Sequence, residues 1–122
     1  MYAALKGNRE MAFGFGKAVK HREIDAAALD AMITAQSAIV VDVREADEFA
    51  AGHIPGAINM PLSTFRPGKL PHHKGKTMVL NCLGGKRSGQ ALDQCAQAKA
   101  GVDTHLAGGF GAWKSAGLPI ER

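Results

Sequence analysis

Cysteine is scarce in this sequence: only Cys82 and Cys95 carry a thiol among 122 residues. Two cysteines in a chain of this size do not make a disulfide scaffold. Neither belongs to a C-x-x-C pair, and the five histidines show no ligand spacing with them, so we expect no metal site. His72 and His73 are adjacent, but their Pro- and Gly-containing surroundings indicate a solvated loop.

Long apolar runs and internal repeats are also missing. No run approaches the roughly 20 apolar residues that a membrane helix needs. The first residues have no apolar core followed by a small-residue cleavage site, so we predict no secretory signal and expect a cytoplasmic protein. The length suits one domain with one sizeable core and is too short for two.

Positive charge is concentrated at the N-terminus. The net charge is +4, and residues 1–22 account for all of it because residues 23–122 hold equal numbers of basic and acidic side chains. We interpret residues 1–20 as a basic, solvated and flexible extension and residues 21–122 as the folded domain. Such an extension could contact an acidic partner or a nucleic acid. No basic–aromatic alternation indicates base stacking, and we expect neither nucleic acid nor membrane as a partner.

Strand-like and helix-like patterns alternate along residues 21–122. A continuous apolar, β-branched run at 38–43 is typical of a strand buried on both faces. Further strands are predicted at 23–25, 57–60, 77–81 and 102–106. Helices are predicted at 26–35 with Asp25 as N-cap, at 45–51, at 88–100, and in a last segment that carries Trp113 and ends at Gly117. This alternation predicts an α/β fold with a mostly parallel sheet and helices on both faces.

One loop combines a cysteine with glycines and basic residues. Strand 77–81 runs into Cys82-Leu83-Gly84-Gly85-Lys86-Arg87-Ser88, at the sheet edge where α/β proteins bind ligands. Cations and a helix N-terminus lower a thiol pKa, and the loop supplies the cations while the next helix directs its amides at the loop. Paired glycines let backbone N–H groups converge on one point. The loop therefore predicts a cysteine sulfur in a pocket that holds negative charge.

Such a pocket suits two chemistries. In sulfur transfer, the Cys82 thiolate attacks the outer sulfur of thiosulfate or of a persulfide, and the resulting cysteine persulfide is held by the amides. In phosphoryl or arsenate chemistry, the same amides bind an oxyanion. A third interpretation is a buried, inert cysteine before a glycine turn, because free cysteines are often buried. The basic Gly-Gly-Lys-Arg-Ser run favours a functional loop over this third interpretation.

The chain resembles the rhodanese (thiosulfate sulfurtransferase) domain over roughly residues 20–122. Three segments in this order carry the resemblance: Val41-Asp42-Val43-Arg44-Glu45 with Glu48-Phe49, Gly52-His53-Ile54-Pro55-Gly56-Ala57 and Asn59; the Cys82 loop with Gly85, Arg87 and Ser88; and Leu106-Ala107-Gly108-Gly109 with Trp113 and Ala116-Gly117-Leu118-Pro119. The resemblance implies a three-layer α/β fold, a five-stranded mostly parallel sheet flanked by helices.

The resemblance also narrows the chemistry. Sulfurtransferases of this fold have an arginine-like position five residues after the cysteine, as Arg87 is after Cys82, whereas related dual-specificity phosphatases have one more residue. This implies a pocket for one sulfur atom, lined by residues 83–88. The implied partners are a small anionic sulfur donor and a thiol or cyanide acceptor, or a protein in either role, with no cofactor. Leu83 stands where many relatives have a polar or basic residue. A rhodanese-fold binding or sulfur-carrier module is the main alternative, ahead of a phosphatase or arsenate reductase.

Several other residues have both a functional and a structural interpretation. Arg44 could line the pocket, although pairing with Asp42 is the favoured role. His53 could act as a general base, but a structural hydrogen bond is favoured because an ionised thiol needs no base. Cys95 lies seven residues into the expected helix, about 10 Å along its axis, too far for a disulfide with Cys82, so we expect it to be packed. Trp113 is interpreted as a core residue, and Gly108-Gly109-Phe110-Gly111 as a tight turn rather than a dinucleotide loop.

Overall fold

The computed structural model describes residues 21–122, and the extension expected at residues 1–20 lies outside this range. Five strands alternate with four α-helices and two short 3₁₀ turns. Their bounds are β1 Arg22–Ile24, α1 Ala26–Thr34, β2 Ala38–Asp42, α2 Ala46–Ala51, β3 Ile58–Asn59, η1 Leu62–Thr64, η2 Pro67–Lys69, β4 Thr77–Asn81, α3 Lys86–Gln97, β5 Thr104–Leu106 and α4 Gly109–Ser115.

All five strands are parallel and form one sheet in the order β1-β5-β4-β2-β3. The α/β fold with a mostly parallel five-stranded sheet is therefore confirmed. The apolar strands β2 and β4 lie at the centre, where β2 pairs with β4 over its full length from Ala38–Thr77 to Asp42–Asn81. Central parallel strands are covered on both faces, which explains their nearly continuous apolar sequences.

Local sequence explains one end of α1 and one end of α2. The Asp25 side chain accepts a hydrogen bond from the Ala28 N–H at 2.8 Å and so begins α1 as predicted. Gly52 ends α2. The predicted extents differ by more than one residue at β5, which begins at Thr104 rather than residue 102, at α3, which spans Lys86–Gln97 rather than 88–100, and at α4, which ends at Ser115 rather than Gly117. The 3₁₀ turns at 62–64 and 67–69 were not predicted.

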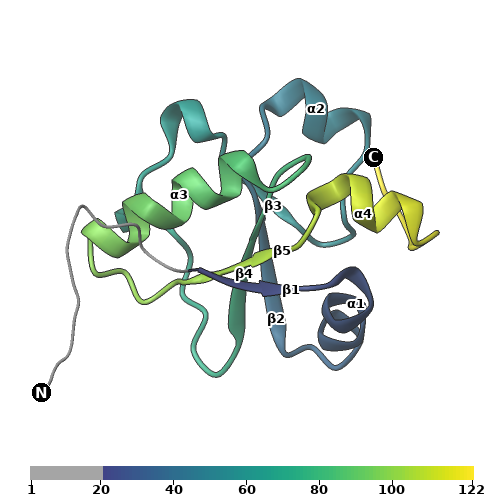
Figure 1. Cartoon of the computed structure of the whole chain (residues 1–122), viewed down its shortest axis with the longest axis horizontal. Helices are drawn as coiled ribbons and strands as arrows, with labels where there is room; N and C mark the ends of the chain where they lie inside the picture. The colour runs from purple at the N-terminus through teal and green to yellow at the C-terminus, as the bar shows by residue number, and fades with distance from the viewer. Residues whose placement is uncertain (1–20) are drawn as a thin grey trace, which may run out of the picture.

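Two apolar clusters fill the two faces of the sheet. Helix α3 contributes Ala91, Leu92 and Cys95 to one cluster, and α1 and α4 contribute Leu29, Phe110 and Trp113 to the other. Accordingly, α3 lies on one side of the strands and α1 and α4 on the other (Figure 1). This is the three-layer arrangement in which the connections after the strands gather at one edge of the sheet. No helix among residues 21–122 is long and apolar enough to cross a membrane.

Candidate active site

Cys82 directly follows β4, in the loop that connects this central strand to α3 (Figure 1). Its side chain is only 1% exposed. The Gly85 N–H donates to its Sγ at 3.0 Å, and the Cys82 thiol donates to the Ser88 hydroxyl at 3.4 Å. The Cys82 loop, residues 82–88, thus encloses the sulfur from the helix side.

The loop conformation depends on Gly85, which is the N-cap of α3. Its φ of 113° lies in the left-handed region, where a side chain would be strained. Because the turn is completed at Gly85, α3 begins at once with Lys86, two residues earlier than the sequence pattern predicted. Lys86, Arg87 and Ser88 therefore form the first turn of α3, where backbone N–H groups have no intrahelical partner and favour negative charge.

The other side of the loop is held by the first turn of α4. The Phe110 N–H donates to the Cys82 carbonyl at 2.7 Å, and the Gly111 N–H donates to the Leu83 carbonyl at 3.0 Å. Because α4 binds these two carbonyls, the loop presents N–H groups and not C=O groups toward the sulfur. The sequence pattern at 108–111 indicated only a tight turn and gave no sign of this role in shaping the site.

The surroundings of Cys82 favour its thiolate. Burial alone would raise the pKa of the thiol, but the Ser88 hydroxyl and the backbone N–H groups of Ser88, Gly85 and Gly84 outweigh burial and bring the pKa below the ordinary 9.0. By contrast, burial raises the pKa of Cys95 to about 11. The two thiols therefore differ in character: Cys82 is a candidate nucleophile, and Cys95 is an unreactive core side chain on α3.

The two basic residues of the loop have different surroundings. Both terminal nitrogens of Arg87 donate to the Glu48 carboxylate of α2, at 2.7 and 3.0 Å. This pairing holds the pKa of Glu48 at about 2, so the ion pair persists at neutral pH. Lys86 is exposed and has no ion pair among residues 21–122. Of the two loop cations, Lys86 is therefore the one without an ion pair among the described residues.

Arg44 lies in a buried ion pair with Asp42. Its Nε and Nη2 donate to the Asp42 carboxylate at 3.0 and 2.7 Å, and Nη2 also donates to the Gly52 carbonyl at 2.8 Å. Its guanidinium carbon lies 4.3 Å from the centre of the Phe110 ring. The Arg44 side chain is 4% exposed, and its contacts hold α2 and α4 against the end of β2. They correspond to the structural role, pairing with Asp42, that the sequence favoured over lining the pocket.

His53 makes its hydrogen bonds within residues 21–122 to segments other than the Cys82 loop. Its backbone pairs with Glu121, its Nδ1 is 2.8 Å from the Phe49 carbonyl, and its ring stacks on that of Phe49. These contacts are the structural role favoured from sequence, and they attach the C-terminal segment to α2. Leu83, at the tip of the loop, has half of its surface exposed and faces solvent beside the site.

One residue near the sulfur was not identified from the sequence. His105 of β5 is buried, and its Nδ1 lies 2.8 Å from the Ser88 hydroxyl that contacts Cys82. A lone histidine in a strand gives no sequence signal, and only the pairing of β5 with β4 places it here. Within residues 21–122 no three His, Cys, Asp or Glu side chains gather as they would around a metal ion.

Comparison with known proteins agrees with this geometry. The family model of the rhodanese-like domain matches residues 25–116. This chain belongs to the rhodanese-like family. The match spans α1 to α4 and so contains the Cys82 loop, its α4 support and both covered faces of the sheet.

This rhodanese-like domain is similar to proteins of several organisms. An uncharacterised protein of Synechocystis is 49% identical over 69% of this chain, which spans only 47% of that protein. A protein of Allochromatium vinosum named sulfurtransferase is 36% identical over 80% of this chain and 92% of its own length. A crystal structure of a rhodanese-related protein from Thermoplasma volcanium has a TM-score of 0.70 and 31% identity over 83% of this chain and 98% of that one.

Proposed function

We propose that this rhodanese-like domain is a thiosulfate or persulfide sulfurtransferase that works through a Cys82 persulfide. The observation that carries the proposal is the position of the Cys82 Sγ, 3.0 Å from a loop amide at the start of α3. The depressed pKa of this thiol supports it. So does the similarity to the Allochromatium sulfurtransferase, since the match covers most of both chains. Both thiols of the described chain are free, which suits the cytoplasm.

The first half-reaction loads the enzyme. The Cys82 thiolate attacks the outer sulfur of thiosulfate and forms a new S–S bond, while the S–S bond of thiosulfate breaks and sulfite leaves with its electron pair. The product Cys82–S–S⁻ carries its negative charge on the outer sulfur. The backbone N–H groups of Gly84, Gly85 and Ser88, which act on the Cys82 sulfur, stabilise that charge without having to reorganise.

The second half-reaction releases the sulfur. A thiophilic acceptor, such as cyanide or a thiolate, attacks the outer sulfur of the persulfide and takes it, and the bond electrons return to Cys82 as its thiolate. No general base at the sulfur is needed for either attack once Cys82 is ionised. A protein could fill either role, since the exposed Leu83 offers an apolar contact beside the sulfur.

The two half-reactions predict double-displacement kinetics. With thiosulfate and cyanide varied together, reciprocal plots of initial rates should give parallel lines, because sulfite leaves before cyanide reacts. Intersecting lines would contradict a persulfide intermediate. Hydrolysis of an aryl phosphate without any thiosulfate turnover would instead support the phosphatase alternative.

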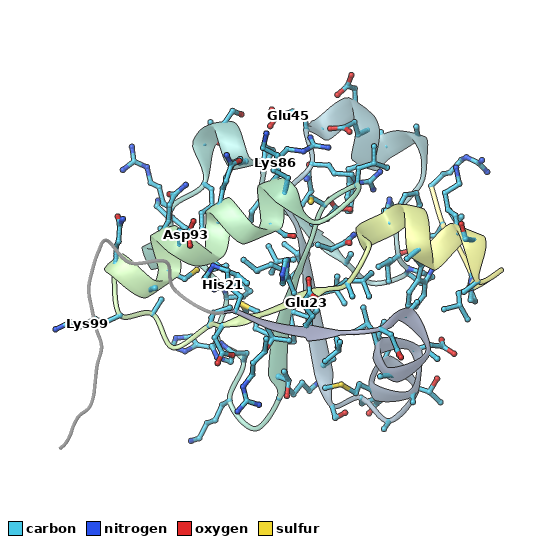
Figure 2. The ribbon with its side chains drawn as sticks, in the orientation of Figure 1. His21, Glu23, Glu45, Lys86, Asp93 and Lys99 are labelled. Atoms are coloured by element: carbon cyan, nitrogen blue, oxygen red, sulfur yellow. The ribbon has the colours of Figure 1, made fainter. Side chains whose placement is uncertain are left out.

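Lys86 is expected to attract the anionic donor, because its charge is not neutralised by a described neighbour. Replacing it with glutamine should raise the KM for thiosulfate about fivefold, as an interaction of about 1 kcal/mol between exposed charges predicts. This increase in KM should be smaller at high salt, because salt screens the charge of Lys86. Lys99 is the matched control, because it lies past the other end of α3 (Figure 2) and Lys99→Gln should leave KM unchanged. Equal effects of the two substitutions would rule out a local role for Lys86.

A further inference from the structure

A chain of polar side chains connects the Cys82 sulfur to the edge of the sheet. The Ser88 hydroxyl is 3.4 Å from the Cys82 Sγ and 2.8 Å from the His105 Nδ1. The opposite ring nitrogen of His105, Nε2, is 3.4 Å from a carboxylate oxygen of Glu23. Cys82, Ser88 and His105 are buried, whereas the Glu23 side chain is 59% exposed. These four side chains therefore link the buried Cys82 thiol to the Glu23 carboxylate at the surface.

Sheet register explains why these side chains meet. His105 pairs with Leu80 of β4 on one side and with Glu23 of β1 on the other, and paired residues of parallel strands point to the same face. Leu80 packs in the cluster under α3, so His105 and Glu23 also face α3. Figure 2 shows Glu23 on β1 and His21 just below α3, near Asp93. Ser88, in the first turn of α3, lies between His105 and the Cys82 sulfur and contacts both.

The Ser88 hydroxyl has one hydrogen and three candidate acceptors. They are the Gly85 carbonyl at 3.2 Å, the His105 Nδ1 and the Cys82 sulfur. When His105 is neutral with its hydrogen on Nε2, toward Glu23, its Nδ1 accepts from Ser88 and the Cys82 S–H donates to Ser88. When His105 is an imidazolium, its Nδ1–H donates to Ser88, and the Ser88 hydrogen is free for the Cys82 thiolate. The ionisation states of Cys82 and His105 are therefore coupled through one hydroxyl.

We propose that His105 accepts the Cys82 proton through Ser88 and thereby generates the thiolate. The S–H bond of Cys82 breaks and its proton passes to the Ser88 oxygen, while the hydrogen already on that oxygen passes to the His105 Nδ1. The products are a thiolate, a neutral serine hydroxyl and an imidazolium. No proton leaves the protein, and the two hydrogen bonds of Ser88, with Cys82 and with His105, reverse direction. His105 is a positioning and proton-accepting residue that never touches the substrate.

The groups around His105 have opposing effects on its pKa. Burial lowers the pKa of His105, the Glu23 carboxylate raises it, and His21 lowers it, with a net decrease. Glu23 comes from β1, and the His21 ring, just before β1, lies edge-on with ring centroids 6.1 Å apart. From α3, Ser88 faces His105, and Asp93 binds the His21 Nε2 at 2.8 Å. Among residues 21–122 the imidazolium thus has one direct carboxylate partner, Glu23, and the Cys82 thiolate is the second negative charge near it.

The inference rests on the proposed role of Cys82 as nucleophile, and alkylation tests it without any sulfur donor. The full chain is treated with iodoacetamide over a range of pH, and the rate at Cys82 is read by peptide mass. In the wild type the rate should rise in two steps, because the imidazolium–thiolate pair forms before the remaining thiol titrates. His105→Leu should show one step, with a rate near pH 6 about tenfold lower and an unchanged rate near pH 10, where the thiol is ionised in both proteins.

Two further variants separate proton acceptance from hydrogen bonding or packing. His105→Asn keeps a polar atom near the Nδ1 position but cannot take up a proton, so it too should show one step. Ser88→Ala removes the hydroxyl that joins Cys82 to His105. The double variant Ser88→Ala/His105→Leu should therefore be alkylated no more slowly than Ser88→Ala alone. His72→Asn, in an exposed loop, is the histidine control and should match the wild type. Thermal melts of each variant confirm folding, and His105→Asn and Ser88→Ala suffice if His105→Leu does not fold.

Two results would overturn the proposed proton transfer from Cys82 through Ser88 to His105. One is a His105→Asn profile identical to that of the wild type, since this residue cannot accept a proton. The other is a rate lowered by the same factor at every pH, which indicates a purely structural effect. Loading of the wild type by thiosulfate is measured separately by intact mass. If thiosulfate adds no sulfur to the wild type, the proposed function is contradicted. The pH profile of alkylation still decides whether His105 accepts the Cys82 proton.

Discussion

Replacing Cys82 by serine is expected to lower thiosulfate–cyanide turnover by at least about a thousandfold, to the background rate. A serine hydroxyl is not ionised by the contacts that favour the Cys82 thiolate, and it cannot form a persulfide. The backbone contacts of the loop, such as the Phe110 N–H to the residue 82 carbonyl, do not involve the sulfur and should persist. Initial rates with saturating thiosulfate and cyanide measure the loss, and circular dichroism checks the fold.

Cys95→Ser is the matched control for this experiment. Cys95 is fully buried in the cluster under α3, and burial raises the pKa of its thiol to about 11, so we expect it to take no part in the chemistry. Most activity should remain, although burying a hydroxyl in place of a thiol should cost about 1 kcal/mol of stability. Cys95→Ala serves if the serine variant is too unstable. Equal loss of turnover in both cysteine variants would contradict the division of roles.

Gly109→Ala is expected to lower turnover about a hundredfold, because misplacing catalytic atoms by about 1 Å has effects of that size. Gly109 has a φ of +59°, and a Cβ at this position would lie 2.4 Å from the Cys82 carbonyl oxygen and 2.6 Å from the Leu83 carbonyl. Backbone atoms cannot rotate away as a flexible side chain can. The loop must therefore shift, and the shift displaces the sulfur from its amide partners.

Gly117→Ala distinguishes this clash from backbone strain. Gly117 follows α4, has a similar φ of +72°, and has open space where a Cβ would lie. Both substitutions should lower the melting temperature, since a left-handed residue with a side chain costs about 1–2 kcal/mol. Only Gly109→Ala should also slow turnover strongly. Similar turnover in the two glycine variants would show that α4 does not shape the loop.

The central strands and the position of the nucleophile could be predicted from the sequence because their signals are local. Strand β4 has the predicted bounds, 77–81, since a continuous apolar run in an α/β pattern has few other interpretations. The loop after it then lies at the carboxyl edge of the sheet by topology alone. Asp25 likewise begins α1 through a contact three residues away.

The rest of the site depends on contacts between distant segments. Arg87 and Glu48 are 39 residues apart, so the loop sequence could not reveal that one of its two cations is paired. His105 reaches Ser88 only because β5 is inserted between β1 and β4. The early start of α3 followed from the backbone angle of Gly85, which a helix-period pattern does not report. The sequence therefore pointed to Cys82 and to the loop amides around it, but not to the Arg87–Glu48 pair or to His105.

The most direct test of the proposed function is the intact mass of the protein after incubation with thiosulfate. Formation of a Cys82 persulfide predicts the addition of one sulfur atom to the wild type and to Cys95→Ser, removal of that atom by cyanide, and no addition to Cys82→Ser. An unchanged wild-type mass, together with hydrolysis of an aryl phosphate, would contradict sulfur transfer through Cys82.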